Sequence, residues 1–241
     1  MFASLANPHR FMRVSRLAAP ILGLAAAGLI AAGLTFGLAV PPDYQQGETV
    51  KIMFVHVPAA WTAMAAYGVL GVASFFSLVF RHAVADAAAK AAAPLGAAFT
   101  AAALVTGSLW GKPMWGTWWT WGDSRLVSVL VLFLLFVGYM ALRASIEDEV
   151  KAARAAEILA LIGLVNLPVI KFSVDWWNTL HQGESIFRAG GPLIAPVYLT
   201  PLALMGAGYL AAFGALWLVR TRSEIRRRRS LALTLRTALS A

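Results

Sequence analysis

The run Leu17–Val40 reads LAAPILGLAAAGLIAAGLTFGLAV and contains no charged residue. A helix needs roughly 17–25 residues to cross the hydrocarbon core of a bilayer. Five further apolar runs of similar length follow along the chain: Ala59–Phe80, Ala91–Trp110, Leu126–Leu142, Ala155–Val174 and Val197–Val219. Because other backbone structures with unpaired polar groups cannot face lipid, we predict that all six runs are transmembrane helices.

The composition of the whole chain also indicates a membrane protein. Of its 241 residues, 60% are hydrophobic and 13% are charged. Soluble domains are nearer half apolar and a quarter charged. The first run exceeds the roughly 7–15 residues of a signal-peptide core, so we interpret it as an uncleaved span. We therefore predict one all-α, polytopic membrane domain over 1–241, a bundle of six transmembrane helices.

The distribution of Lys and Arg predicts the orientation of this bundle. Cytoplasmic segments of membrane proteins carry an excess of these residues. Most of the 20 Lys and Arg residues lie at the two termini and in the second and fourth loops. The remaining loops contain Lys51, Lys112, Arg125, Lys171 and Arg188. Both termini are therefore predicted to be cytoplasmic, and loops one, three and five to face outward.

The predicted cytoplasmic tail, 220–241, is strongly basic and includes the run Arg226–Arg229. Such a run binds anionic lipid head groups, at about 1 kcal/mol per residue. We therefore attribute the net charge of +9 to sidedness and lipid contact, and expect no nucleic acid as a partner. The chain has no cysteine and no phosphate-binding loop of the G-x-x-x-x-G-K-[ST] type, so we expect no thiolate site and no ATP hydrolysis by that route.

Two of the four histidines are predicted to face outward. His56 lies in HVPAAW, just before the second span, and His181 lies in WWNTLHQGESI, soon after the fifth. His9 and His82 fall on the cytoplasmic side. A lone histidine at a membrane surface usually has no special role, but two that approach from different loops are candidate ligands.

A tryptophan-rich loop, 110–125, lies between these histidines in the sequence and includes KPMWGTWWTWGDS over 112–124. Indoles are enriched at membrane interfaces, so anchoring is one interpretation of these side chains. Five indoles within 110–121 exceed what anchoring requires, and the glycines and proline indicate a shaped loop. If a helical turn forms here, Trp115, Trp118 and Trp119 share one face and make a flat apolar platform.

A porphyrin fits these residues better than a compact metal ion does. Zinc takes three or four close ligands, and nearby acidic residues such as Asp43 and Glu184 resemble no zinc motif. A porphyrin is a large apolar plane that stacks on indoles, and its iron has two axial positions that imidazoles can fill. Lys112, Arg125 and Arg188 are candidates for pairing with the propionates.

The three motifs resemble those of the haem exporter protein C family, or CcmC, of bacterial cytochrome c maturation. The likeness covers nearly the whole chain, with HVPAAW, KPMWGTWWTW and WWNTLHQGESI in the same order. It implies a multi-pass protein of the bacterial inner membrane that holds haem b as transient cargo. It also implies that haem is presented at the periplasmic face and passed to a membrane-anchored haem chaperone. The implied partners are the other subunits of an ABC-type complex: an ATPase, a second permease and a small membrane subunit.

Matched residue by residue, the resemblance implies that His56 and His181 are the axial ligands of the haem iron. The other implied haem-binding residues are Trp115, Gly116, Trp118, Trp119, Trp121, Asp123 and Arg125. The family pattern is W-G-x-W-W-x-W-D-x-R-L-T, whereas here Gly122 separates Trp121 from Asp123, and Val127 replaces the threonine. In a helix, one inserted residue rotates the following residues by about 100°. A local bulge or turn at Gly122 would absorb this insertion.

Three other functions are compatible with parts of the pattern. A transporter permease that moves haem or another substrate through its own bundle predicts polar residues inside the spans, for which Asn166 and Glu157 are candidates. A ligand-free assembly subunit would need neither outer histidine. A cytochrome c haem lyase of the same tryptophan-rich group is disfavoured by the short chain. We expect haem delivery by ligand exchange, with no catalytic residue and no enzymatic activity on this chain.

Overall fold

The computed structural model describes residues 7–183, 185–187 and 190–240. Arg188, a candidate partner of the propionates, and Glu184, one of the nearby acidic residues, therefore lie outside the described residues. Six helices are long and apolar enough to cross a membrane, which confirms the predicted fold class. Between the helices, the described residues form loops, a short 3-10 helix and one isolated bridge that joins Asp43 to Gly47.

Each predicted span corresponds to helical structure that extends beyond the apolar run. The helices are α2 (Pro8–Ala39), α3 (Met53–Phe80), α4 (Ala83–Trp115), α5 (Ser124–Ser145), α6 (Glu149–Gly163), α7 (Asn166–Trp176) and α8 (Pro196–Ser240), with the 3-10 helix η1 (Glu48–Ile52) before α3. The helices are longer than predicted because the prediction counted apolar residues, whereas a helix continues through polar residues beyond the hydrocarbon core.

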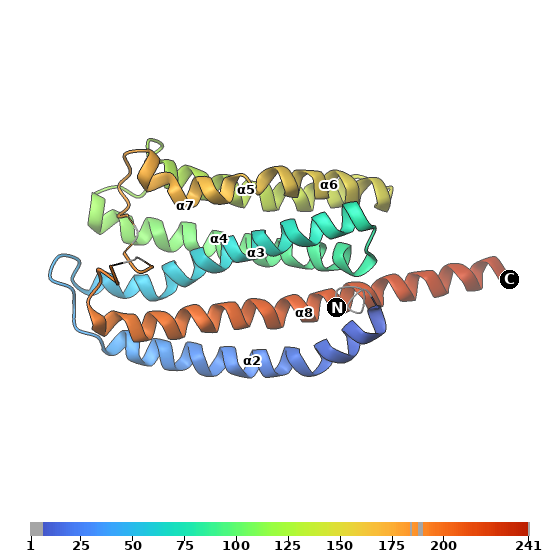
Figure 1. The fold of residues 1–241 in the computed structure, drawn as a ribbon, viewed down its shortest axis with the longest axis horizontal. Coiled ribbons are helices and arrows are strands. Elements are labelled where there is room, and N and C mark those ends of the chain that lie inside the picture. Colours follow the sequence, from blue (N-terminus) through green and yellow to red (C-terminus); the bar gives the residue numbers. More distant parts are fainter. Residues whose placement is uncertain (1–6, 184, 188–189, 241) are drawn as a thin grey trace.

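The helices form a bundle in which α3 and α4 lie between the pair α2–α8 and the group α5, α6 and α7 (Figure 1). Successive spans run in opposite directions. Both ends of the described chain and the α3–α4 and α5–α6 turns therefore lie at one end of the bundle, the terminal end. The loops after α2, α4 and α7 lie at the other end, which we call the tryptophan end. This alternation is the one that the predicted orientation requires.

Small residues allow close contact between α3, α4 and α5 in the bundle core. Tyr67 and Phe136 are fully buried there among alanines of α3, α4 and α6. Gly96 of α4 lies directly against Phe136, and a Cβ at this position would overlap the aromatic ring. Membrane helices gain little hydrophobic attraction from one another in lipid, so close packing of this kind contributes much of their association.

The fifth span is broken rather than continuous. Helix α6 ends at Gly163 and α7 begins at Asn166, with a turn between them. Pro168 has no N–H group to donate to the carbonyl of Leu164, four residues earlier, and its ring clashes with that carbonyl in a regular helix. The break therefore lies on the N-terminal side of Pro168.

Ion pairs connect the helices at the terminal end. Asp86 of α4 pairs with Arg143 of α5, at 2.7 Å, and with Arg228 of α8. Arg227 pairs with Glu224 on the same helix at 2.9 Å. Two of the four arginines predicted to bind lipid head groups are therefore paired within the protein, because α8 continues as a helix into the basic tail and brings them to acidic partners.

Candidate functional site

His56 lies near the start of α3 and not in the preceding loop as predicted. The prediction began the span after Pro58, but α3 begins at Met53 and contains this proline. Nδ1 of His56 is 3.0 Å from the carbonyl oxygen of Ala103 and 3.2 Å from Oγ1 of Thr106, both on α4. Because a carbonyl oxygen only accepts, Nδ1 carries the proton and Nε2 keeps its lone pair. No residue in the described part of the chain hydrogen-bonds to this Nε2.

The surface of α4 is shaped to receive this imidazole. A Cβ at Gly107 would lie 2.9 Å from Cε1 of His56, so only glycine leaves room for the ring. Trp110, on the same side of α4, makes an edge contact with His56 at a centroid distance of 5.7 Å. Sequence reasoning missed Thr106 and Gly107, whose only signal is a small polar residue next to a glycine in an apolar helix.

His181 lies in the loop after α7, as predicted, and Asp123 holds its imidazole. Nδ1 of His181 is 3.3 Å from Oδ1 and 3.4 Å from Oδ2 of Asp123. The ring of Trp115, the last residue of α4, contacts the imidazole edge-on at a centroid distance of 4.9 Å. The ionised carboxylate accepts the Nδ1 proton, which leaves Nε2 as the free nitrogen, with no hydrogen-bond partner among the residues that the structure describes.

Asp123 joins the loop before α5 to the loop after α7. Its side chain is 2% exposed and accepts hydrogen bonds from the backbone N–H groups of Leu126, at 2.9 Å, and Leu180, at 2.7 Å. Burial by itself raises the pKa of this carboxyl, but the hydrogen bonds from His181, Leu126 and Leu180 outweigh burial and lower the pKa to about 2. Asp123 is therefore a carboxylate at neutral pH.

The inserted Gly122 is absorbed by a turn, as predicted. The backbone N–H of Asp123 is 3.4 Å from the carbonyl oxygen of Thr120, and the turn between them contains Trp121 and Gly122. Helix α5 starts only after this turn, with Asp123 as its N-cap. The insertion therefore does not rotate Asp123 within a helix, and the aspartate reaches His181 from the helix start.

The tryptophan loop is irregular, so the helical turn that would place Trp115, Trp118 and Trp119 on one face does not form. Helix α4 includes Trp115 and ends at Gly116, whose φ of 75° is favourable for glycine and turns the chain away from the helix axis. The irregular segment 116–123 is accordingly shorter than the predicted loop 110–125. Nε1 of Trp119 is buried and has no hydrogen-bond partner in the described structure.

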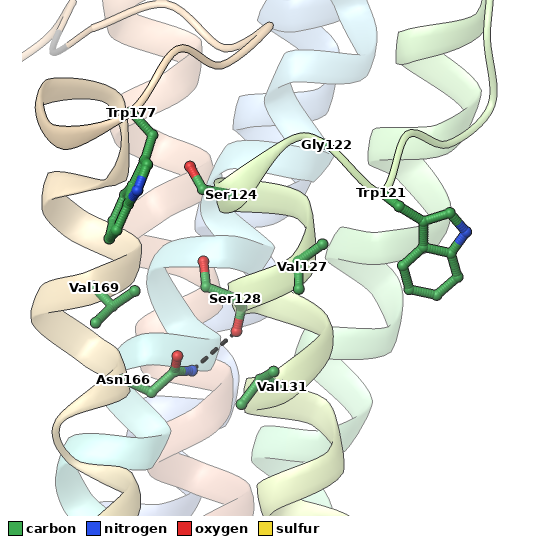
Figure 2. A pocket seen from close by; sticks show the side chains of 9 residues that line it. All are labelled: Trp121, Gly122, Ser124, Val127, Ser128, Val131, Asn166, Val169 and Trp177. Atoms are coloured by element: carbon green, nitrogen blue, oxygen red, sulfur yellow. Dashed lines mark hydrogen bonds between the residues drawn. The ribbon is translucent and has the colours of Figure 1, made fainter.

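The two most exposed indoles of the loop border different hollows. Trp121 is 74% exposed and borders a groove of about 400 Å³ between α5 and α7, with Trp177 on the opposite wall. Figure 2 shows this groove and the hydrogen bond from Asn166 to the carbonyl oxygen of Ser128, 2.9 Å long. Trp118 is 54% exposed and borders a second hollow along α4. These two exposed indoles therefore do not border a common hollow.

Two of the predicted propionate partners, Lys112 and Arg125, lie among the described residues. Arg125 donates from Nε to Oγ of Ser173 at 3.2 Å and from Nη2 to the carbonyl oxygen of Lys171 at 3.3 Å, so it joins α5 to α7. Lys112 is exposed and donates to the carbonyl oxygen of Gly116 at 2.9 Å. Arg125 thus connects α5 to α7, and Lys112 lies at the surface.

The arrangement is suited to a metal that brings its own equatorial ligands. Among the described residues, no group of three or more His, Cys, Asp and Glu side chains comes together to hold a bare ion. His56 and His181 contact Trp110 and Trp115 of α4, respectively, and each offers Nε2 while Nδ1 is held by an acceptor. Histidines that bind a metal usually donate their second ring nitrogen to a carbonyl or carboxylate in this way.

Comparison with known proteins gives one family. The family model described as heme exporter protein C matches residues 1–236. The chain is 53% identical to heme exporter protein C of Bradyrhizobium diazoefficiens, over 97% of this chain and 89% of that protein. It is 49% identical to the Paracoccus denitrificans protein, over 96% of each chain, and 46% identical to that of Escherichia coli K12, over 92% of this chain and 89% of that protein. The chain therefore belongs to the heme exporter protein C family.

Proposed function

We propose that this chain is a haem-binding membrane subunit of a cytochrome c maturation system, with His56 and His181 as the axial ligands of the iron. One observation carries the proposal: two imidazoles from different elements lie at the same end of the bundle, and each is held through Nδ1 with Nε2 left to bind. The relatives are named as heme exporters, which supports haem as the cargo. A haem iron needs only these two axial positions from the protein.

Helix α4 supports both ligands in this proposal. It supplies the acceptors for His56 and places the indoles of Trp110 and Trp115 against His56 and His181, respectively. These indoles offer apolar surface beside the iron ligands. Trp118 and Trp121 remain exposed at the same end, where they can contact an edge of the porphyrin or an incoming protein.

The proposal extends to where and how the haem is handed over. The cargo is haem b, held transiently at the periplasmic face of the bacterial inner membrane, with both termini and the tail 220–241 in the cytoplasm. A membrane-anchored haem chaperone takes the cargo by replacing the histidines as iron ligands. The ATPase, second permease and small membrane subunit of an ABC-type complex are the proposed partners. The distribution of Lys and Arg supports this orientation.

The structure favours this role over a permease that conducts substrate through its own bundle. A conducting path is marked by polar or ionisable groups along the spans. The ion pairs of Asp86, Arg143 and Arg228 lie at the terminal end and connect three helices. Asn166 donates to a backbone carbonyl of α5. These groups are used in helix packing. Glu157, the other predicted candidate, is buried in α6, and its Oε1 has no hydrogen-bond partner among the described residues. A single buried carboxyl does not mark a path along the spans.

Purification with the haem chaperone tests the proposal directly. Wild-type protein in detergent should show a Soret band, and the bound haem should be lost in a His56→Ala, His181→Ala double variant. Each single variant should change the spectrum and reduce haem loading of the chaperone. His9→Ala and His82→Ala are controls, because these histidines lie at the other end of the bundle. An unchanged haem spectrum in the double variant would reject the assigned ligands.

A further inference from the structure

We infer that Asp123 is a positioning residue, which orients His181 for iron binding and does not itself contact haem. This inference rests on the proposed function, because it takes His181 to be an iron ligand. The resemblance to the family implied a haem-binding role for Asp123. The contacts of its carboxylate give it a different role.

The carboxylate of Asp123 is fully used within the protein. Oδ1 accepts the N–H of Leu126 and Oδ2 accepts the N–H of Leu180, and both oxygens lie within 3.4 Å of Nδ1 of His181. With the side chain 2% exposed, neither oxygen is directed to an outside group. A carboxylate would also repel the negatively charged propionates of haem. The aspartate therefore acts on the cargo through His181.

His181 needs such a residue more than His56 does. The backbone of His56 belongs to α3, and that helix fixes the direction of its side chain. The backbone of His181 lies in an irregular loop, so its direction depends on contacts made by the loop. Asp123 provides them from the rigid start of α5: one bond to the N–H of Leu180 places the backbone, and one to Nδ1 places the ring.

The two proposed ligands consequently differ in donor strength. Nδ1 of His56 donates to a neutral carbonyl, whereas Nδ1 of His181 donates to a carboxylate. A carboxylate partner makes the imidazole a more basic ligand. His181 is therefore the stronger donor to iron of the two proposed ligands.

Two substitutions test the negative charge of Asp123 and the length of its side chain separately. Asn and Ser both remain good N-caps, so α5 is preserved in each variant. Asp123→Asn keeps the length of the side chain but removes the charge, and it puts an amide that only donates where Oδ2 accepted the N–H of Leu180 and faced Nδ1 of His181. Haem should therefore bind more weakly, and the haem that is retained should have a higher midpoint potential because His181 becomes a weaker donor. Asp123→Ser is too short to reach His181 and should bind haem about 10-fold to 100-fold more weakly. Asp148→Ser is the matched control, since Asp148 caps α6 at the terminal end.

A double-mutant cycle tests whether Asp123 acts on haem binding through His181, or instead contacts haem directly or affects the protein in general. If Asp123 acts through His181, Asp123→Ser should cause no further loss of haem affinity in a His181→Ala background. Equal losses with and without His181 would overturn the inference while leaving the proposed ligand in place. An unchanged affinity in Asp123→Ser, or an unchanged midpoint potential in Asp123→Asn, would also overturn it. If His181→Ala itself leaves haem affinity and spectrum unchanged, the proposed function fails at this ligand.

Discussion

At the scale of single residues, the space left by one glycine decides where His56 sits. The imidazole lies against the backbone of α4 at Gly107, and this contact brings Nδ1 to the carbonyl of Ala103 and the hydroxyl of Thr106. A side chain at position 107 would require the ring to shift from this position. The direction of Nε2 therefore depends on a residue that carries no functional group.

We expect Gly107→Ala to weaken haem binding by up to about 10-fold, the lower range for changes beside a metal ligand. The added methyl group would approach Cε1 of His56 to 2.9 Å, so the ring must shift. Haem titration followed by Soret absorbance measures the effect. Gly68→Ala is the control on α3, because a Cβ there meets nothing within 4 Å. Equal affinities for the two variants would contradict the geometry described for His56.

At the scale of helices, the contact between α4 and α5 positions both halves of the site. Helix α4 carries the partners of His56, and the start of α5 carries Asp123, which holds His181. The two helices approach closely at Gly96, where the ring of Phe136 occupies the space of a side chain. A change in this contact would shift the two histidines relative to each other, although it lies within the bundle core.

We predict that Gly96→Ala destabilises the protein by about 1–3 kcal/mol, the usual cost of overpacking a core. The new methyl group would overlap the ring of Phe136, which is fully buried and has little room to move. Thermal unfolding in detergent gives the comparison with wild type. Gly28→Ala should be neutral or slightly stabilising, because nothing lies within 4 Å of its Cβ position and alanine favours a helix. A destabilisation of similar size in both variants would argue against the packing described at Gly96.

At the scale of the whole molecule, alternation of the six spans places every proposed ligand at one end. The chain has no cysteine, so single introduced thiols report the orientation of that end. We expect Gly183→Cys, in the loop that contains His181, to react with a membrane-impermeant maleimide in intact spheroplasts. Ser230→Cys, exposed on the tail of α8, should react only after the membrane is permeabilised. The reverse pattern of labelling would invert the proposed orientation.

Several features of the site followed from residue patterns, and others did not. The turn at Gly122 was predictable because glycine next to an inserted position commonly accommodates a change of chain direction. The platform of Trp115, Trp118 and Trp119 was predicted wrongly, since helical spacing was assumed where Gly116 ends the helix with a positive φ. The role of Arg125 could not be read from sequence, because its partners lie on α7, about 46 residues away along the chain.

The sequence by itself determined the class of the protein, its six spans and the end at which the histidines and tryptophans gather. These features follow from the length of the apolar runs and from the distribution of Lys and Arg along the chain. Both act locally, because they determine how each segment inserts into the bilayer. The tertiary structure alone decided that His56 is bonded to α4, that Asp123 supports His181, and that the indoles are divided between two hollows. Such contacts join residues far apart in the sequence, and they depend on how closely whole helices pack. A local residue pattern does not predict this packing.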